Sequence, residues 1–345
     1  MRHLGELRPL LGVMAKDLPR YLRALTAPGE AYASLCNRNE RLERSPDGHG
    51  YRCLWQWTSD LHAPKHLPML GAALMRRALR DHPIRAAAAP FDVQQPRISF
   101  IVGHRGLDRL GHLLATLETI AGQREAAVEC VVVEQDTQPL VRERLPAWVR
   151  YVHTPPPRPD LAYCRSWAFN VGVRHARADV LVLHDNDMLV PQDYAMQVLH
   201  QLARGFEVVN LKRFVFYLTQ AHTERYFRGE ASLTAQAPLA VMQNAEGGGS
   251  LAITRAAYDG IGGFDEAFVG WGGEDVEFWE RAGSRRVWPY AFLPLVHLWH
   301  GPQPDKMARQ NETLALYRSR TQTPVDQRIA ALRALPCGDI TGPRV

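Results

Sequence analysis

The chain has 345 residues, of which 46% are hydrophobic and 22% are charged, and its formal net charge is +5. This composition is that of a globular protein with enough length for a substantial core in one or two domains. Basic residues are spread along the chain rather than gathered in one block, so nucleic acid is not an expected partner. The best leader candidate, residues 10–15, is too short for a membrane span or a signal-peptide core, and Lys16 and Asp17 follow it.

The cysteine pattern favours a reducing compartment. The chain has an odd number of widely spaced cysteines and no C-x-x-C pair, namely Cys36, Cys53, Cys130, Cys164 and Cys337. Cys36 and Cys53 lie near His49, but their spacing fits no zinc module. We therefore expect free thiols, a cytoplasmic location and no transmembrane segment, while peripheral contact with a membrane stays open.

The first 95 residues predict a mostly helical extension. Short amphipathic helices are expected over Leu4–Leu25, interrupted at Pro9 and Pro19, and another helix over Leu67–Leu79. Residues 37–51 are polar and rich in turn formers, and residues 86–96 have the character of a connector. The role of this extension is not evident from its residues.

From residue 97 the pattern changes to short apolar runs that alternate with helical segments. The runs that predict strands are 97–102, 128–133, 151–153 and 180–183. Leucines at helical spacing predict a helix over 110–120, and Asp160 can cap another helix that runs to about Arg177. Continuous apolar strands separated by helices indicate an α/β class with a doubly wound, mostly parallel sheet flanked by helices.

Polar residues follow these predicted strands directly, as Gly103–Gly106, Glu134–Asp136 and His184–Asp187. A doubly wound sheet binds its ligands at the carboxyl ends of its strands. The sequence therefore predicts a binding site along this edge of the sheet.

Asp185-Asn186-Asp187 places two carboxylates two residues apart at the end of an apolar strand. Period-two geometry can aim both side chains to one face, where they repel each other unless a cation lies nearby. Hard divalent ions such as Mn²⁺ or Mg²⁺ suit oxygen ligands of this kind. The alternative is an Asx-turn that leads to Pro191 and the next helix.

A second acidic segment is Gly270-Trp271-Gly272-Gly273-Glu274-Asp275. Its glycines give the backbone freedom, and its two acids open a predicted helix over 276–281, where the helix macrodipole favours negative charge. Alone it can be read simply as a helix start after a glycine loop. Further on, His297 and His300 close an apolar strand over 291–296, and imidazole with carboxylate is a normal ligand set for Mn²⁺. A histidine in such a place is more often structural.

Taken together, four blocks resemble glycosyltransferases of the GT-A fold. They are residues 98–102 with Arg105; Arg165, Asn170 and Gly172 leading into Asp185 and Asp187; residues 248–253; and residues 262–265 through 271–275. The chain is especially similar to the group that joins family-2-type bacterial transferases, chondroitin-polymerase-like enzymes and the β-1,4-galactosyltransferases. The resemblance covers roughly residues 97 to 315, and the W-G-G-E-D motif in this order after D-x-D is its most specific part.

The resemblance implies a site of donor and metal ligands. Donor and nucleotide contacts fall on Arg105, Asp136, Arg165, Asn170, Asp185, Gly248, Gly249 and Trp271. Metal ligands fall on Asp187, Asp185 and His300, with His297 the less favoured histidine, and the metal is Mn²⁺ or Mg²⁺. The expected boundaries are an extension over 1–95, a catalytic domain over 96–320 and a C-terminal tail over 321–345.

The resemblance also implies the reaction. Asp275 resembles the base that takes a proton from an acceptor hydroxyl, and Glu274 the residue that holds sugar hydroxyls. This implies an inverting transferase that moves a sugar from a nucleotide-sugar, a UDP-sugar by expectation, to a glycan or lipid-linked acceptor in polysaccharide synthesis. Retaining GalNAc-transferases share W-G-G-E but usually carry Asn where this chain has Asp275.

Several alternatives compete with this prediction. A retaining transferase and a non-catalytic glycan-binding module stay open, although the joint presence of Asp185, Asp187, Asp275 and His300 disfavours the module. No G-x-G-x-x-G follows the first strand and no Walker A lysine motif occurs, which argues against a Rossmann dehydrogenase and a P-loop NTPase. Two segments depart from the family pattern. Gly103 and His104 stand where the family commonly has a proline-containing turn, and Glu134-Gln135-Asp136 stands where family-2 enzymes usually have Asp-Asp-Gly-Ser.

Overall fold

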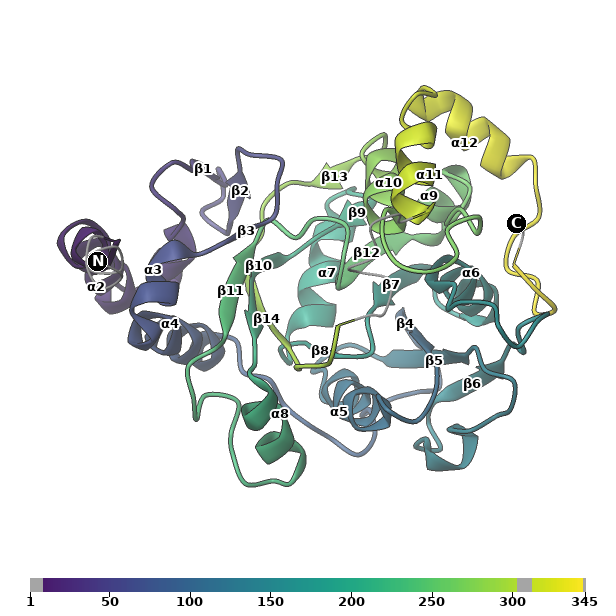
Figure 1. Ribbon diagram of the computed structural model, residues 1–345, viewed down its shortest axis with the longest axis horizontal. Coiled ribbons are helices and arrows are strands. Elements are labelled where there is room, and N and C mark those ends of the chain that lie inside the picture. The colour runs from purple at the N-terminus through teal and green to yellow at the C-terminus, as the bar shows by residue number, and fades with distance from the viewer. Residues whose placement is uncertain (1–8, 303–311, 344–345) are drawn as a thin grey trace, which may run out of the picture.

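The computed structural model describes residues 9–302 and 312–343. They form two mixed sheets and a short hairpin, with helices around them (Figure 1). The larger sheet has the strand order β13-β9-β12-β7-β4-β5-β6, and the smaller one β3-β11-β10-β14-β8. The hairpin joins β1 (Leu42–Arg44) to β2 (Tyr51–Cys53).

The larger sheet has a parallel centre. β4 (Ile98–His104) pairs in parallel with β5 (Val128–Glu134) on one side and with β7 (Val180–His184) on the other. β6 (Arg150–His153) extends this parallel set beyond β5. β12 (Ser250–Thr254) then runs antiparallel to β7, and the short strands β9 (Val208–Val209) and β13 (Val287–Trp288) complete the sheet. The four predicted strands are thus present, in a sheet that is mostly parallel.

Helices cover both faces of this sheet, as Figure 1 shows. Alternate residues of β4 point to opposite sides: Phe100 and Val102 join one buried cluster, and Ile101 joins another. The first cluster includes residues of α5 (Leu110–Ala121) and α7 (Tyr194–Ala203). The second includes residues of α6 (Arg165–His175), α9 (Arg255–Gly260) and α10 (Glu274–Ala282). The predicted α/β class with a doubly wound sheet is confirmed.

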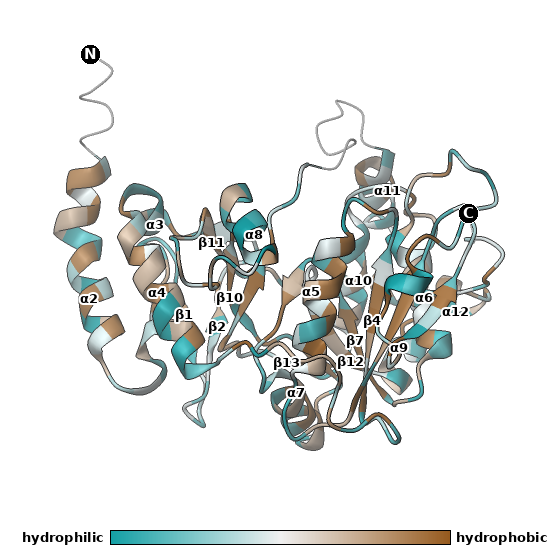
Figure 2. Ribbon diagram, turned by 90° about the horizontal axis from the view of Figure 1, so that it is seen from below, coloured by the Kyte–Doolittle hydropathy of each residue, from teal (hydrophilic) through white to brown (hydrophobic). Residues whose placement is uncertain are grey.

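The smaller sheet lies beside the larger one, and its central strands are largely apolar (Figure 2). β10 (Lys212–Tyr217) pairs in parallel with β14 (Leu293–His297) and antiparallel with β11 (Ala240–Gln243). The outer strands are β3 (Ser59–Asp60) and β8 (Met188–Leu189). Because β8 follows β7 and β14 precedes His300, this sheet brings two distant segments of the chain together.

The described part of the N-terminal extension, residues 9–95, packs against the smaller sheet. Their helices are α2 (Leu18–Thr26), α3 (His62–His66) and α4 (Pro68–Asp81), and β3 is a strand of the sheet itself. Tyr21 and Leu74 share one buried cluster with Phe214 and Val296. Arg213 is 1% exposed, and its guanidinium donates to the carbonyl oxygens of Ala33 (2.7 Å) and Leu35 (2.6 Å). The boundaries near residues 95 and 320 remain predictions.

Two predicted helix boundaries were wrong. Asp160 does not cap a helix, because α6 begins only at Arg165. The residue before it, Cys164, is held by the side chain of Gln135, which forms hydrogen bonds of 2.7 and 3.0 Å with the Cys164 backbone. Pro19 does not interrupt the N-terminal helix either. It lies in the first turn of α2, directly after a π-helical turn over Val13–Asp17, and the helical chain continues through it. The part of that prediction before residue 9 lies outside the described residues.

The C-terminal helices α11 (Glu312–Arg320) and α12 (Val325–Arg333) pack against α10. Helix α8 (Gln220–Phe227) is part of the segment of chain that connects β10 to β11. Among the described helices, none combines the length and apolar character that a membrane span needs.

Candidate active site

The predicted binding edge of the larger sheet is assembled by contacts between strand ends. After β4, the backbone N–H of Gly106 donates to Asp136 Oδ2 (3.2 Å), which follows β5. His104, at the end of β4, accepts at Nδ1 from Asn186 Nδ2 (2.9 Å), which follows β7, and its Nε2 contacts the carbonyl oxygen of Gly106 (2.7 Å). Burial lowers the pKa of His104 to about 4, so this linking imidazole is neutral at pH 7.

Three potential metal ligands meet where β7, β14 and the segment after β14 converge. They are Asp187, His297 and His300, whose ligand atoms all lie within 4.8 Å of one another. His300 Nε2 lies 3.4 Å from Asp187 Oδ2, and His297 Nε2 lies 3.7 Å from Asp187 Oδ1. Neighbouring ligands of a six-coordinate ion with bonds of about 2.1 Å are roughly 3 Å apart, so this spacing suits an ion such as Mn²⁺ or Mg²⁺.

The chemistry of these groups also fits a metal. Asp187 is 3% exposed, and its Oδ1 has no hydrogen-bond partner among the described residues. Burial alone would raise the pKa of Asp187, yet electrostatic interactions with its neighbours, first His297 and then Arg109, hold it below its usual range. Burial lowers the pKa of His300 against the pull of Asp187, which leaves a neutral imidazole at pH 7. A buried carboxylate with an unpartnered oxygen beside neutral imidazole is a suitable donor set for a divalent cation.

Arg109, which the sequence analysis did not single out, also reaches this cluster. It occupies the N-cap position of α5, and its guanidinium contacts Asp187 Oδ2 (3.0 Å) and His300 Nδ1 (2.9 Å). On the same helix, His112 Nε2 lies 2.7 Å from the carbonyl oxygen of Trp299 and so fixes the backbone next to His300. No motif marks either residue, and only their position at the start of a helix that follows a site-bearing strand could have drawn notice.

The second centre is Arg165, the first residue of α6, which collects three carboxylates. Its Nε and Nη2 donate to Asp185 Oδ1 at 2.9 and 2.5 Å, its Nη1 donates to Asp275 Oδ1, and Glu274 Oε1 lies 3.6 Å from Nη1. Asp185 is therefore paired with Arg165 and is not a member of the three-residue cluster around Asp187. Arg165 brings the D-x-D segment and the W-G-G-E-D segment into one site.

Both acids of the W-G-G-E-D segment hold protons more tightly than usual. Burial raises the pKa of Glu274, and the charge of Asp275 beside it adds to the effect. The pKa of Asp275 is raised by burial and by Asp185, although Arg165 acts in the opposite direction. Glu274 Oε2 is buried without a hydrogen-bond partner among the described residues. Acids of this kind suit proton transfer near neutral pH.

Glycines allow the chain to pass close to Asp275. A Cβ at Gly247 would lie 2.6 Å from the carbonyl oxygen of Asp275, and one at Gly248 would lie 3.3 Å from its Oδ2. The third glycine of that run, Gly249, has a φ of +82° and accepts from the backbone N–H of Asp185 (2.9 Å). In the W-G-G-E-D segment Gly273 caps α10 at a φ of +89°, a backbone conformation that residues with a Cβ rarely adopt.

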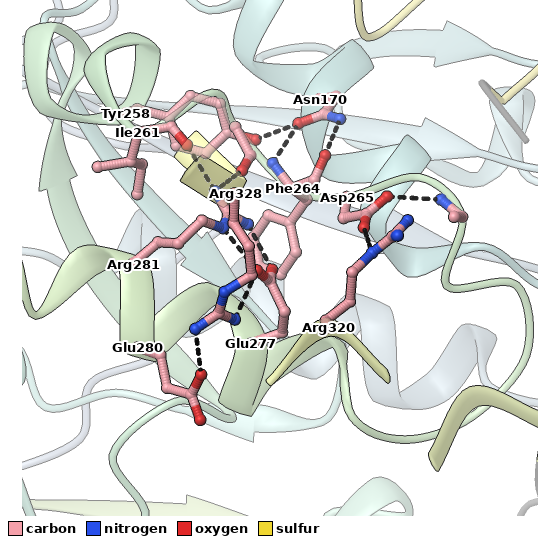
Figure 3. A network of polar contacts seen from close by, with 12 residues as sticks. Asn170, Tyr258, Ile261, Phe264, Asp265, Glu277, Glu280, Arg281, Arg320 and Arg328 are labelled. Atoms are coloured by element: carbon pink, nitrogen blue, oxygen red, sulfur yellow. Dashed lines mark hydrogen bonds and ion pairs between the residues drawn. The ribbon is translucent and has the colours of Figure 1, made fainter. Parts of the chain in front are cut away.

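The helix that presents Asp275 is anchored by a buried polar network (Figure 3). Glu277 accepts from Arg281 at both carboxylate oxygens (2.8 and 2.6 Å) and from Arg328 (3.2 Å). Arg281 also donates to the carbonyl oxygens of Ile261 (2.7 Å) and Gly263 (2.6 Å). This network ties α10 both to α12 and to the loop that precedes the W-G-G-E-D segment.

Asn170 belongs to this structural framework rather than to the open site. It is 1% exposed, and its amide donates to Phe264 O (2.9 Å) and Glu266 Oε1 (2.8 Å). Its Oδ1 accepts from the backbone N–H of Phe264 (2.9 Å) and from the Tyr258 hydroxyl (2.5 Å). All four hydrogen-bonding positions of the amide are thereby used within the protein. The side chain of Asn170 therefore has no polar atom left to bind a donor molecule.

Two predicted donor-binding residues remain, Trp271 and Arg105. Trp271 is 37% exposed, and Arg105 donates through Nη1 to the carbonyl oxygen of Leu161 (2.7 Å). Lys212, at the start of β10, was not predicted. Its ammonium donates to the carbonyl oxygen of Ser250, and burial lowers its pKa to about 7, against the charges of Asp275 and Asp185.

Comparisons with known proteins agree with the resemblance carried by these motifs. Residues 239–287 match the family model described as the N-terminal domain of galactosyltransferase. Beta-1,4-galactosyltransferase 5 of Danio rerio is 28% identical to this chain over 121 residues, which are 34% of the chain and 26% of the relative. The chain therefore aligns with only about a quarter of that relative. Both matches support a chain of the galactosyltransferase-like GT-A group.

Solved structures of glycosyltransferases give weaker similarities. The catalytic domain of Drosophila beta-1,4-galactosyltransferase 7 has a TM-score of 0.36 at 14% identity, covering 66% of this chain and 82% of that one. Glucosyl-3-phosphoglycerate synthase of Mycobacterium tuberculosis has a TM-score of 0.43 at 14% identity, covering 66% and 80%. Scores of this size do not define a fold by themselves. The sheet confirms the predicted α/β class, and the sequence matches show a similarity to galactosyltransferases.

Proposed function

We propose that the chain is a metal-dependent, inverting glycosyltransferase that moves a sugar from a nucleotide-sugar, a UDP-sugar in our proposal, to a hydroxyl of a glycan or lipid-linked acceptor. The observation that carries this proposal is the convergence of two centres. Asp187, His297 and His300 form a potential metal site, and Arg165 joins Asp185 to Asp275 beside it. A transferase needs both a place for the diphosphate and a base for the acceptor.

The metal site would hold Mn²⁺ or Mg²⁺ through Asp187, His297 and His300. When bound there, the ion would supply positive charge against the negative charge that develops on the departing diphosphate. Asp185 would stay with Arg165 and face the donor's ribose. Asp136, which accepts from the backbone of Gly106 after β4, would face the nucleotide base.

Asp275 would act as the general base. Its Oδ1 is held by Arg165, and its Oδ2 lies on the side of Gly248, where no side chain intervenes. In the proposed step the acceptor oxygen forms a bond to the anomeric carbon while the bond from that carbon to the diphosphate oxygen breaks. The hydroxyl proton passes to Asp275, and the electron pair leaves with the diphosphate. One displacement of this kind inverts the anomeric centre.

Sugar recognition would come from the remaining groups of the W-G-G-E-D segment. Trp271 exposes 37% of its surface and can stack on a sugar ring, and Glu274 has an unpartnered oxygen that can hydrogen-bond a sugar hydroxyl. The segment between Tyr217 and Gln243, which includes α8, borders the smaller sheet and is our candidate for the acceptor side.

The replacement Asp275→Asn tests the assignment of the base. We expect this variant to bind Mn²⁺ and UDP with wild-type affinity in calorimetry and to transfer sugar at least about a hundredfold more slowly, because a general base contributes about 10²–10⁴-fold. Asp179, whose side chain is 98% exposed, provides the matched control Asp179→Asn, which should leave both quantities unchanged. Near-wild-type transfer by Asp275→Asn would show that another group is the base.

A further inference from the structure

The helical segment over residues 9–26, which ends with α2, has one face inside the protein. Its buried residues recur every three or four positions, which places them along one side of a helix. They are Val13, Asp17, Tyr21 and Ala24. The apolar members of this set belong to the buried cluster that packs on the smaller sheet. The opposite face of the segment therefore points away from the protein.

This outer face is mostly apolar. The exposed residues of the segment are Leu11, Met14, Ala15, Lys16, Pro19, Leu22, Arg23 and Thr26. Leu11, Met14 and Leu22 expose 62%, 47% and 54% of their surface. A helix on the surface of a globular protein usually presents charged and polar residues on its outer side. An outer face that is apolar instead is typical of a surface that binds a partner or a membrane.

The charges on the outer face are positive. Lys16 and Arg23 are exposed beside the apolar residues. The only acid of the segment, Asp17, is 5% exposed and lies 3.7 Å from Arg20 Nη1 and 3.5 Å from Arg38 Nε. Its charge is thus turned inward and offset by two guanidiniums. Apolar side chains flanked by cations complement a surface that is apolar beneath a layer of negative charge.

The segment also lies at one end of the molecule. Figures 1 and 2 place α2 at one end of the longest axis, with α3 and α4 on its inner side. None of the described elements covers the outer face, since its leucines stay exposed. A flat lipid surface can therefore reach this face without displacing any described part of the chain.

We propose that the outer face of residues 9–26 binds membranes that contain anionic lipid. Leu11, Met14 and Leu22 enter the boundary between headgroups and acyl chains, and Lys16 and Arg23 pair with lipid phosphates. Contact of this face with a second copy of the chain would bring like charges together, which favours lipid as the occupant. The inference goes beyond the proposed function and does not depend on it.

Co-sedimentation with lipid vesicles tests the proposal on the full chain. We expect vesicles of phosphatidylcholine with about 30% phosphatidylglycerol to bind the protein at least roughly tenfold more tightly than vesicles of phosphatidylcholine alone, because each cation near an anionic surface strengthens binding. Raising the salt concentration from about 0.1 M to about 1 M should reduce this preference, since the Debye length falls from about 10 Å to about 3 Å.

Single replacements locate the binding face. Leu22→Glu should weaken binding to the anionic vesicles at least roughly tenfold, because it removes apolar area and adds a charge that the lipid repels. The matched control is Leu335→Glu, in a leucine that is 52% exposed after α12, and it should bind as wild type does. Lys16→Gln should weaken binding about fivefold, the effect of one cation. Leu11→Glu provides the same comparison if Leu22→Glu does not fold.

The outcomes separate lipid from other occupants. Equal binding to both kinds of vesicle, or wild-type binding by Leu22→Glu, would overturn the proposal. A dimer in sedimentation velocity that Leu22→Glu converts to a monomer, with vesicle binding unchanged, would assign the face to a second copy of the chain instead. Mn²⁺-dependent hydrolysis of a UDP-sugar in solution should be the same in wild type and Leu22→Glu. Failure of the proposed transfer reaction therefore leaves the vesicle result unaffected.

Discussion

At the scale of single residues, the site depends on pairing each charged group with a suitable partner. Asp187 is paired with Arg109, and Asp275 shares Arg165 with Asp185 and Glu274. The sequence predicted these acids because their short motifs carry the chemistry. It did not predict Arg109, because a lone arginine before a helix has no motif, and only the fold brings it to His300.

The ligand set provides the first prediction at this scale. His297→Ala and His300→Ala should each weaken Mn²⁺ binding by at least roughly tenfold, because each removes one ligand of the three. His49→Ala, in an exposed histidine outside the site, is the control. Calorimetry with Mn²⁺ checks the result. Wild-type affinity in His297→Ala would remove His297 from the ligand set and leave Asp187 and His300, two of the three ligands that the sequence predicted together with Asp185.

The pH dependence of transfer provides the second prediction at the scale of single residues. A base acts only when it is deprotonated, and the pKa of Asp275 is raised by burial and by Asp185. The value of kcat/KM should therefore rise with pH through a pKa above the ordinary aspartate range of about 3.9. The profile should be measured at saturating Mn²⁺, so that protonation of the histidine ligands does not contribute. A rate that stays constant down to the ordinary aspartate range would contradict the role of Asp275.

At the scale of elements, periodicity predicted the long apolar strands well and the two-residue strands not at all. β4, β5 and β7 are continuous apolar runs that are buried on both faces, whereas β8 and β9 have two residues each and owe their strand character to neighbours. The wrong cap at Asp160 has the same origin, because a side-chain contact from Gln135 decides where α6 begins. Contacts between residues far apart in the chain, such as Gln135 with Cys164, cannot be predicted from the local sequence pattern.

The anchoring of α10 provides a prediction at this scale. Glu277→Ala should lower the free energy of unfolding by about 3–5 kcal/mol, because it leaves the buried guanidinium of Arg281 without its carboxylate and Arg328 with only that of Glu280. Glu280→Ala, in a neighbour whose side chain is 30% exposed, should cost no more than about 1 kcal/mol. Urea unfolding measures both. Equal losses in the two variants would show that the buried network does not stabilise α10.

At the scale of the whole molecule, residues 9–95 are part of the framework around the site. They complete the smaller sheet through β3 and bury Tyr21 and Leu74 against its strands, two of which lead to Asp187 and His300. The sequence predicted helices there but gave no partner for them, because the partner strands lie more than a hundred residues away. Whether this part also contacts the acceptor is a proposal that its position favours.

The central claim is that two neighbouring centres act together in one inverting, metal-dependent transfer. UDP-glucose, UDP-galactose and UDP-N-acetylglucosamine are first tested for Mn²⁺-dependent thermal stabilisation of the protein. Proton NMR then follows slow hydrolysis of the stabilising donor, in which water replaces the acceptor. We predict that the β anomer of the released sugar appears first, only with Mn²⁺, and not with Asp275→Asn. Early release of the α anomer, or release that persists in a chelator, would contradict the account.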